Sequence, residues 1–255
     1  MPLTLVTVPC LSDNYAFLVH DPDSGRTALV DAPEADPIQA ELAARGWALS
    51  DILITHSHHD HIGGVETLRN AYGARVVGFA GDTGRLPPLD LAVAEGDEIE
   101  VCRERVRVIE VPGHHAGHIA FHFPASGLAF TGDSLMALGC GRLFEGTPAE
   151  MWHSLLKLRA LPPDTLVCSG HEYTQANGRF AATIEPENPD LISRLSDVDA
   201  RRAAGEATVP SLLSTEIATN PFLRADLPQV AEAVGLAGAD PVEVFAEVRR
   251  RKDNF

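Results

Sequence analysis

The chain has 255 residues, of which 45% are hydrophobic, and a formal net charge of −16 at pH 7. A chain of this length can bury a full hydrophobic core, and its hydrophobic content is ordinary for a globular protein. The acidic excess argues against nucleic acid as the main partner, because binding to nucleic acid depends on a basic surface.

Features of the N-terminus, the hydropathy and the cysteines indicate where the protein resides. Residues Met1–Leu5 enter a predicted strand with no charged segment, long apolar run or cleavage site before it. No stretch approaches the roughly 20 apolar residues of a transmembrane helix. The four cysteines, Cys10, Cys102, Cys140 and Cys168, have neither disulfide nor zinc-finger spacing. We therefore expect a protein of the reducing cytoplasm without a membrane partner.

The first informative element is a strand that leads into a histidine-rich loop. Asp51–Thr55 is a short apolar run typical of a strand, and Ile62–Leu68 opens an amphipathic helix. Between them stands His-Ser-His-His-Asp-His, residues 56–61. A polar helix-capping loop, with Asp60 near the helix N-terminus, is the simpler alternative. Four metal-type side chains within six residues are hard to reach by chance, so a metal site is favoured.

The spacing within this loop suits two adjacent metal sites better than one. In an extended loop His56 and His58 project from the same side, whereas Asp60 and His61 lie one turn further on, where the helix begins. Imidazole and carboxylate ligands without cysteine favour zinc, iron or manganese used for chemistry over a structural thiolate site. His59 is expected to point away from the ligands, either supporting them or facing solvent.

Three further predicted strands end beside a glycine and a candidate ligand. Two metal ions that share ligands and a bridging solvent need roughly seven protein groups, so partners for the loop are required. The three segments are Arg105–Val111 before Pro112-Gly113-His114, Leu128–Thr131 before Gly132-Asp133, and Thr165–Cys168 before Ser169-Gly170-His171. Loops at one end of a rigid sheet are where folds place functional groups, so we expect these side chains to complete the site.

The first of these segments offers three histidines that compete for one position. His114 is the first side chain available after the Pro112-Gly113 turn, and we prefer it over His115 and His118. His118 leads into another predicted strand, Ile119–Phe123, and is expected to be a structural residue that forms hydrogen bonds. The other two segments contain no rival to Asp133 or His171 of the same type.

The pattern of elements changes near residue 174. Up to about Thr174 short strands alternate with helices, whereas Gln175–Leu195 and Ser196–Gly205 contain no strand pattern. Pro241–Lys252 carries apolar residues at helical spacing. The prediction is an α/β protein, with an αβ/βα sandwich followed by a smaller, mainly α-helical domain. We expect two domains, at residues 1–174 and 175–255; the family resemblance described below implies that the first is catalytic and that the second binds the substrate.

The motifs together resemble a known family. The His-x-His-x-Asp-His signature and the later His, Asp and His resemble the metallo-β-lactamase superfamily. More specific motifs resemble glyoxalase II, the hydroxyacylglutathione hydrolases, over essentially the whole chain. These motifs are Leu11–Tyr15, Gly139–Gly146, Gly170–Thr174, Pro186–Pro189, Thr219–Arg224 and the terminal Arg249–Phe255.

The resemblance implies a binuclear metal centre. It assigns one ion to His56, His58 and His114, a second to Asp60, His61 and His171, and a bridging role to Asp133. Two divalent ions are expected, with zinc preferred and iron or manganese also compatible. They would generate a hydroxide that attacks the thioester of S-D-lactoylglutathione and releases glutathione, the second step of methylglyoxal detoxification. Asp60 could also orient the attacking solvent.

The resemblance also implies contacts to glutathione. Arg249 and Lys252 would bind the glycine carboxylate, with Arg142 and Tyr173 on the rest of the peptide. Phe144 stands where some members have tyrosine, so a hydroxyl contact to glutathione would be absent. The alternative for the basic C-terminal run is that it complements the dipole of a helix.

Two other functions stay open at this stage. A glutathione persulfide dioxygenase with a single iron shares much of the ligand set, but such relatives typically lack the long helical C-terminal domain. A non-catalytic metal-binding member would be expected to have lost ligands, whereas all seven are present here. We expect a small-molecule glutathione thioester as the substrate and a monomeric protein.

Overall fold

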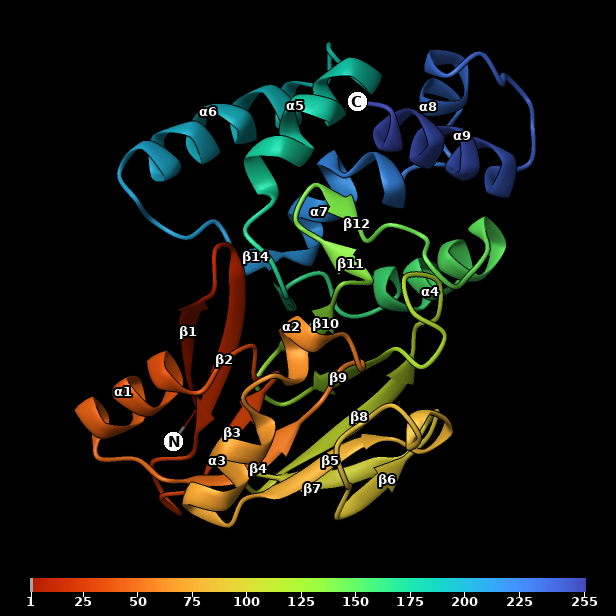
Figure 1. Cartoon of the computed structure of the whole chain (residues 1–255). Coiled ribbons are helices and arrows are strands. Elements are labelled where there is room, and N and C mark those ends of the chain that lie inside the picture. The colour runs from red at the N-terminus through yellow and green to blue at the C-terminus, as the bar shows by residue number, and fades with distance from the viewer. Residues whose placement is uncertain (1) are drawn as a thin grey trace. The chain divides into compact units, whose positions relative to one another are not determined.

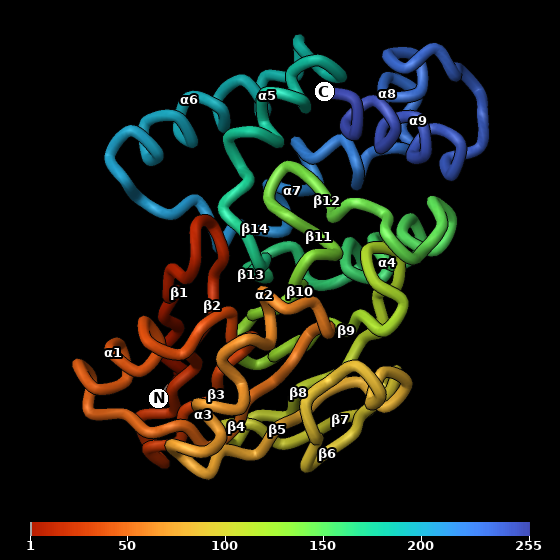
Figure 2. The backbone as a smooth tube through the Cα atoms, viewed as in Figure 1, coloured from red at the N-terminus to blue at the C-terminus, as the bar shows by residue number. Residues whose placement is uncertain are grey.

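The computed structural model describes residues 2–255, and Figures 1 and 2 show the path of the chain. The chain packs as two compact units, which are described separately. The first runs up to Glu110 and also includes Gly117–Gly132; the second comprises Val111–Ala116 and Asp133–Phe255.

The first unit contains a six-stranded sheet in the order β1-β2-β3-β4-β5-β6. Its strands are β1 (Thr4–Cys10), β2 (Asn14–His20), β3 (Thr27–Val30), β4 (Leu49–Leu53), β5 (Arg75–Phe79) and β6 (Leu91–Val93). The first three strands are antiparallel, and Figure 2 shows β1 and β2 running side by side. From β3 to β6 the pairing is parallel. Parallel neighbours end at the same edge of the sheet, which gathers the loops after β3 and β4.

Helices provide the crossovers of the parallel part. α1 (Asp36–Arg45) joins β3 to β4, whereas α2 (His59–Ile62) and α3 (Val65–Tyr72) join β4 to β5. One hydrophobic cluster contains Ile38 and Leu42 of α1, Leu68 of α3, and Leu18 and Ile52 of the sheet. The helices therefore cover one face of this sheet and bury their apolar sides against it.

A second, antiparallel set of strands lies on the other face. It has the order β10-β9-β8-β7, with β7 (Glu98–Val101), β8 (Glu104–Glu110), β9 (Ile119–Phe123) and β10 (Leu128–Gly132). Along β8, buried and exposed residues alternate over most of the strand, as the sequence predicts. The ring of Phe17 in β2 lies 5.5 Å from that of Phe130 in β10, centroid to centroid. The two sheets thus pack face to face within the first unit.

The second unit is mainly helical (Figure 1). Its elements are β11 (Leu135–Met136), β12 (Gly139–Cys140), α4 (Pro148–Arg159), β13 (Leu166–Ser169), α5 (Thr174–Ile184), α6 (Pro189–Ala203), β14 (Ser211–Leu212), α7 (Leu213–Thr219), η2 (Pro221–Leu223), α8 (Pro228–Ala233) and α9 (Pro241–Asp253). The short 3₁₀ turn η1 (Ala80–Asp82) belongs to the first unit. Three of the helices begin with a side-chain cap followed by proline, at Thr147, Asn188 and Asp240. Such caps satisfy backbone N–H groups that a helix leaves unpaired at its start.

A chain of aromatic rings joins the helices of the second unit. Ring centroids are 6.0 Å apart for Phe180 and Phe222, 5.9 Å for Phe222 and Phe245, and 6.0 Å for Phe245 and Trp152. These residues belong to α5, η2, α9 and α4, respectively. Aromatic burial of this kind contributes strongly to core stability, so it fixes α9 against α4 and η2.

The predicted strands and helices are found in the structure, with ends shifted by a few residues. β9 has the predicted bounds, whereas the strand expected at Asp51–Thr55 is β4, Leu49–Leu53. None of the described helices is long and apolar enough to cross a membrane. The two compact units are a division by packing. The functional division at Thr174 remains a prediction.

Candidate metal centre

The histidine loop begins where β4 ends and is held by backbone hydrogen bonds. The Ile54 N–H donates to the Val77 carbonyl at 2.9 Å, and the Thr55 carbonyl accepts from the Ile119 N–H at 2.9 Å. His58 is extended, with φ −63° and ψ 142°, and precedes the first turn of α2. Asp60 lies in that first turn, where a carboxylate complements the helix dipole. The prediction that Asp60 and His61 lie where a helix begins is confirmed.

Within the loop, the candidate ligands approach one another in pairs. His56 Nε2 lies 3.0 Å from His58 Nδ1, and His61 Nε2 lies 3.8 Å from Asp60 Oδ2. His56 and His61 are completely buried. Two ring nitrogens that face each other at this distance need a proton or a cation between them. The pairs match the expectation that His56 and His58 serve one site and that Asp60 and His61 serve another.

Asp31 orients two of these histidines. Its Oδ2 lies 2.8 Å from His61 Nδ1 and accepts a 2.8 Å hydrogen bond from the Thr55 hydroxyl. Since that hydroxyl donates its proton to Asp31, its oxygen is left to accept from His56 Nδ1, 3.0 Å away. Both imidazoles thus carry the proton on Nδ1 and present the Nε2 lone pair, the arrangement that a metal ligand requires. The side chains therefore fit a bound metal ion.

Sequence reasoning missed Asp31, and it quoted Asn14 only as part of a motif. The amide of Asn14 donates to the backbone carbonyl and to Oδ2 of Asp60, both at 3.0 Å, and so holds that carboxylate in place. A signal for Asp31 was present, because it directly follows the buried strand β3, just as the candidate ligands follow their own strands.

The second unit carries the three remaining candidate ligands as a cluster of their own. Asp133 Oδ2 lies 3.5 Å from His114 Nε2 and 3.2 Å from His171 Nε2. All three side chains are buried. His114 Nδ1 donates to the carbonyl of Arg142 at 2.8 Å, so the lone pair of the ring is on Nε2, the atom that faces Asp133. A carboxylate between two imidazoles is compatible with the bridging role expected of Asp133.

Close backbone approaches hold this cluster together. The Phe144 and Gly146 N–H groups donate to the carbonyls of His114 and Gly113, at 3.3 and 3.1 Å. A side chain at Gly141 would lie 2.0 Å from the Asp133 carbonyl and 2.8 Å from His114 Nδ1. Only glycine fits there, which explains why the Gly-x-Gly segment at 139–141 follows the Asp133 turn.

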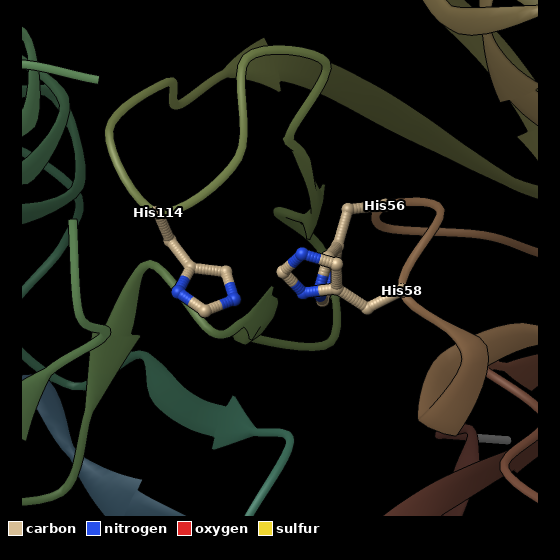
Figure 3. Close-up of side chains that lie close together, drawn as sticks. All are labelled: His56, His58 and His114. Atoms are coloured by element: carbon tan, nitrogen blue, oxygen red, sulfur yellow. The ribbon is translucent and has the colours of Figure 1, made fainter. Parts of the chain in front are cut away.

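Three groups of side chains could each hold a metal ion. They are His56, His58 and His114; His56, His61 and Asp133; and Asp60, His61 and His171. In each group the ligand atoms lie within 4.8 Å of one another. Figure 3 shows the first group, with the imidazoles of His56 and His58 projecting from one loop and His114 from another. The seven residues of these groups are the seven that the sequence singles out.

The competing histidines have other surroundings. Among the described residues, none of the three groups contains His59, His115 or His118. His59 is exposed, as expected of a residue that points away from the site. The buried ring of His118 stacks on that of His56, with centroids 4.5 Å apart and planes at 15°. His118 therefore packs against a candidate ligand and belongs to none of the three groups.

Two aromatic side chains of the expected glutathione set lie against ligands of the second unit. Tyr173 stacks on His171, with ring centroids 4.6 Å apart and planes at 9°. Phe144 lies 5.3 Å from the ring of His114. Both are exposed, at 38% and 61%, respectively, and so present apolar surface beside the ligands.

The basic residues at the end of α9 differ in what they contact. The buried Arg249 donates to the Cys140 carbonyl at 3.0 Å and pairs with Asp253 at 2.8 Å. Lys252 Nζ donates to the Ala176 carbonyl at 3.3 Å. In contrast, Arg250 and Arg251 both pair with Glu247 on their own helix. Arg251 also donates to the Val234 carbonyl at 2.8 Å, whereas Arg249 and Lys252 contact β12 and α5.

Comparison with known proteins gives the same assignment along the whole chain. Residues 11–171 match the model of the metallo-beta-lactamase superfamily, and residues 172–255 match the model described as "Hydroxyacylglutathione hydrolase C-terminus". A hydroxyacylglutathione hydrolase of Cereibacter sphaeroides is 68% identical over 255 residues, covering 100% of both chains. One of Ruegeria pomeroyi is 60% identical with the same coverage.

Solved structures support the fold. The BLEG-1 B3 metallo-beta-lactamase has a TM-score of 0.67 at 20% identity, covering 86% of this chain and 99% of that one. ETHE1 from Myxococcus xanthus has a TM-score of 0.60 at 26% identity, covering 89% and 99%. The prediction of a metallo-β-lactamase fold with a helical C-terminal domain is confirmed. The chain thus belongs to the metallo-β-lactamase superfamily and, within it, to the hydroxyacylglutathione hydrolases, or glyoxalase II enzymes.

Proposed function

We propose that this protein is a cytoplasmic, monomeric thioesterase that hydrolyses S-D-lactoylglutathione to glutathione and D-lactate, the second step of methylglyoxal detoxification. The observation that carries the proposal is a complete set of seven ligand-type side chains in a chain similar over its full length to hydroxyacylglutathione hydrolases. The histidines whose Nδ1 is fixed by a hydrogen bond support it further, because that bond prepares Nε2 for a metal.

The residues divide into two metal sites with a shared carboxylate. His56, His58 and His114 would hold one ion, Asp60, His61 and His171 the other, and Asp133 both. Nitrogen and oxygen ligands suit zinc best, with iron and manganese as alternatives. When bound, a pair of such ions supplies a hydroxide nucleophile near neutral pH and polarises the carbonyl that is attacked.

The protein's own groups orient the reaction. The carboxylate of Asp60, which accepts a hydrogen bond from Asn14, would also accept one from the attacking solvent. Asp31 keeps His56 and His61 in the tautomer with the proton on Nδ1, so that Nε2 of each ring carries the lone pair that a metal ion binds. No serine or cysteine nucleophile is required. The leaving group is the glutathione thiolate.

The peptide part of the substrate would bind to residues 175–255 and to the segment around Arg142. The thioester carries carboxylates, whereas the chain has a net charge of −16, so a local cluster of cations is needed to attract it. Arg249 and Lys252 are assigned to the glycine carboxylate, and Arg142, Tyr173 and Phe144 to the rest of the peptide.

The test is hydrolysis of S-D-lactoylglutathione by the purified protein, followed as loss of thioester absorbance, with metal content determined on the same sample. Turnover with about two metal ions per chain, as a two-metal site requires, is the expected result. Absence of turnover in fully metallated protein would overturn the proposal. Oxygen consumption with glutathione persulfide would then be measured, because the persulfide dioxygenases share much of this ligand set.

A further inference from the structure

One carboxylate stands among the cations assigned to glutathione. Asp253, the last residue of α9, follows Lys252 and lies one helical turn after Arg249. Its Oδ1 lies 2.8 Å from Arg249 Nη2 and 3.5 Å from Arg142 Nε. A single carboxylate oxygen therefore links two guanidinium groups that come from opposite ends of the second unit's sequence.

The two arginines are held by Asp253 in different ways. The Arg249 side chain is 7% exposed and is also bound to the Cys140 carbonyl, so its position is fixed by the packing of α9 on β12. The Arg142 side chain is 60% exposed, and its contact with Asp253 is long. An exposed pair of this kind contributes little and exchanges easily. Arg142 can therefore exchange Asp253 for another anion, whereas Arg249 is held by both Asp253 and the Cys140 carbonyl.

Other charges around Asp253 are mostly positive. The pKa of Lys252 is lowered by its burial and then by the neighbouring Arg249 and Arg179, and Asp253 opposes this effect. Arg179 lies on α5 with an exposed side chain. Arg142, Arg179, Arg249 and Lys252 thus form a cationic cluster in which Asp253 is a counter-charge. An anionic ligand that enters the cluster meets that carboxylate.

We propose that Asp253 is an affinity-determining residue, an internal competitor that takes the place of a substrate carboxylate on Arg142 in the free protein. This inference rests on the proposed function, because Asp253 can compete with a carboxylate of glutathione only if the protein binds a glutathione thioester. Asp253 weakens the binding of both substrate and product. Glutathione is therefore released faster after each turnover, because the Asp253 carboxylate can pair with Arg142 again as the product leaves.

A purely structural role for Asp253 makes the opposite prediction. Charge pairs four residues apart stabilise helices modestly, and Asp253 with Arg249 is such a pair. If Asp253 served only to hold Arg249 in place, removing its charge would loosen Arg249 and weaken glutathione binding. If Asp253 competes, removing its charge strengthens binding. The sign of the change therefore separates the two roles.

The test compares Asp253→Asn with Glu247→Gln in the metal-loaded, full-length protein. Both substitutions remove one negative charge from α9 and keep the size of the side chain. Glu247 contacts Arg250 and Arg251, which are not assigned to the substrate. Calorimetry would give the Kd for glutathione, and steady-state kinetics would give KM and kcat for S-D-lactoylglutathione.

Asp253→Asn should lower the Kd for glutathione and the KM roughly three- to tenfold, as expected for one nearby charge at a solvated site, without raising kcat. Glu247→Gln should leave these values unchanged. Glutathione amidated at its glycine should show a smaller gain, because it lacks one of the two carboxylates that could compete. An unchanged or higher Kd in Asp253→Asn would overturn the proposal.

Asp253→Ser removes the charge with a smaller side chain, and it serves as the second variant if the asparagine protein does not fold. Failure of the proposed function gives a different result. In that case the metallated wild-type protein does not hydrolyse the thioester, whatever the variants do. Hydrolysis by the wild type together with an unshifted Kd in both Asp253 variants rejects the competitor role alone.

Discussion

The imidazole of His114 donates from Nδ1 to the backbone carbonyl of Arg142 at 2.8 Å. This bond links a candidate metal ligand to a segment assigned to substrate binding, because the Arg142 side chain lies beside Asp253. The same bond gives a structural reason why His114, rather than His115 or His118, suits the role of a ligand. The bond fixes the tautomer of His114, and Nε2 then faces Asp133 at 3.5 Å.

Replacing Asp31 by asparagine should weaken the metal centre without unfolding the protein. Asparagine cannot act as the anionic acceptor that Asp31 offers to His61 and Thr55, so the orientation of two imidazoles is lost. We expect metal affinity and activity to fall by about 10- to 100-fold, the usual effect of removing a residue that orients a metal ligand. Metal competition with a chelator, alongside a thermal unfolding curve, measures both quantities.

A matched pair at Thr55 controls for this prediction. Thr55→Ser retains the hydroxyl between Asp31 and His56 Nδ1, whereas Thr55→Val removes it with little change in shape. Metal affinity should be retained in the serine variant, which keeps the hydroxyl, and should fall in the valine variant, which lacks it. Equal metal affinity in all of these variants would show that the tautomer of His56 does not depend on this chain of bonds.

Asp133→Ala should abolish metal binding and activity together. The Asp133 carboxylate lies between His114 and His171, and no other carboxylate belongs to the candidate group that contains it. Losing a shared ligand affects both ions at once. Metal analysis of the purified variant provides the measurement, with retained binding of two ions as the result that excludes a bridging role.

The sequence is sufficient to locate the candidate ligands because each one is marked locally. Each candidate stands shortly after the end of a predicted strand, so neighbouring residues in the sequence are enough to find it. Asp31 also follows a strand, but that position alone does not reveal its role. Its role depends on the parallel pairing of β3 with β4, which aligns Val30 with Leu53 and places Asp31 beside Thr55. Strand order of this kind depends on contacts between distant segments.

The C-terminal helix illustrates the same limit. Its amphipathic pattern predicts α9 within one residue of its observed end, Asp253. Yet the sequence alone does not distinguish Arg249, which is buried and bound to Cys140, from Arg250, which pairs with Glu247 in solvent. The difference arises from the face of α9 that packs against β12 and the aromatic rings of the second unit.

Phe144→Tyr should improve substrate binding. Phe144 is 61% exposed and lies beside the ring of His114. Some members of the family have tyrosine at this position. An added hydroxyl can form one hydrogen bond to the peptide, which corresponds to a KM lower by about three- to tenfold. Phe144→Leu, which adds no hydroxyl, provides the control. A KM that is the same in the tyrosine variant and the wild type would mean that the ring does not reach glutathione.

Lys252 should make the affinity for the substrate depend on pH. Burial, followed by the charges of Arg249 and Arg179, lowers the pKa of Lys252 below the ordinary lysine value of 10.5. Binding of a carboxylate requires the protonated amine, so affinity is full at pH values below this pKa and is lost as the pH rises through it. Because the pKa is lowered, KM should begin to rise at a lower pH than an ordinary lysine would allow.

Lys252→Arg separates this effect from other titrations. Arginine stays charged throughout the accessible pH range, so its KM should not rise in the alkaline region where that of the wild type does. Lys252→Ala should mainly raise KM at every pH, since it removes binding that is equal for substrate and transition state. A parallel alkaline rise of KM in the wild type and the arginine variant would assign the titration to another group. A reduced kcat with unchanged KM in the alanine variant would contradict a role in substrate binding.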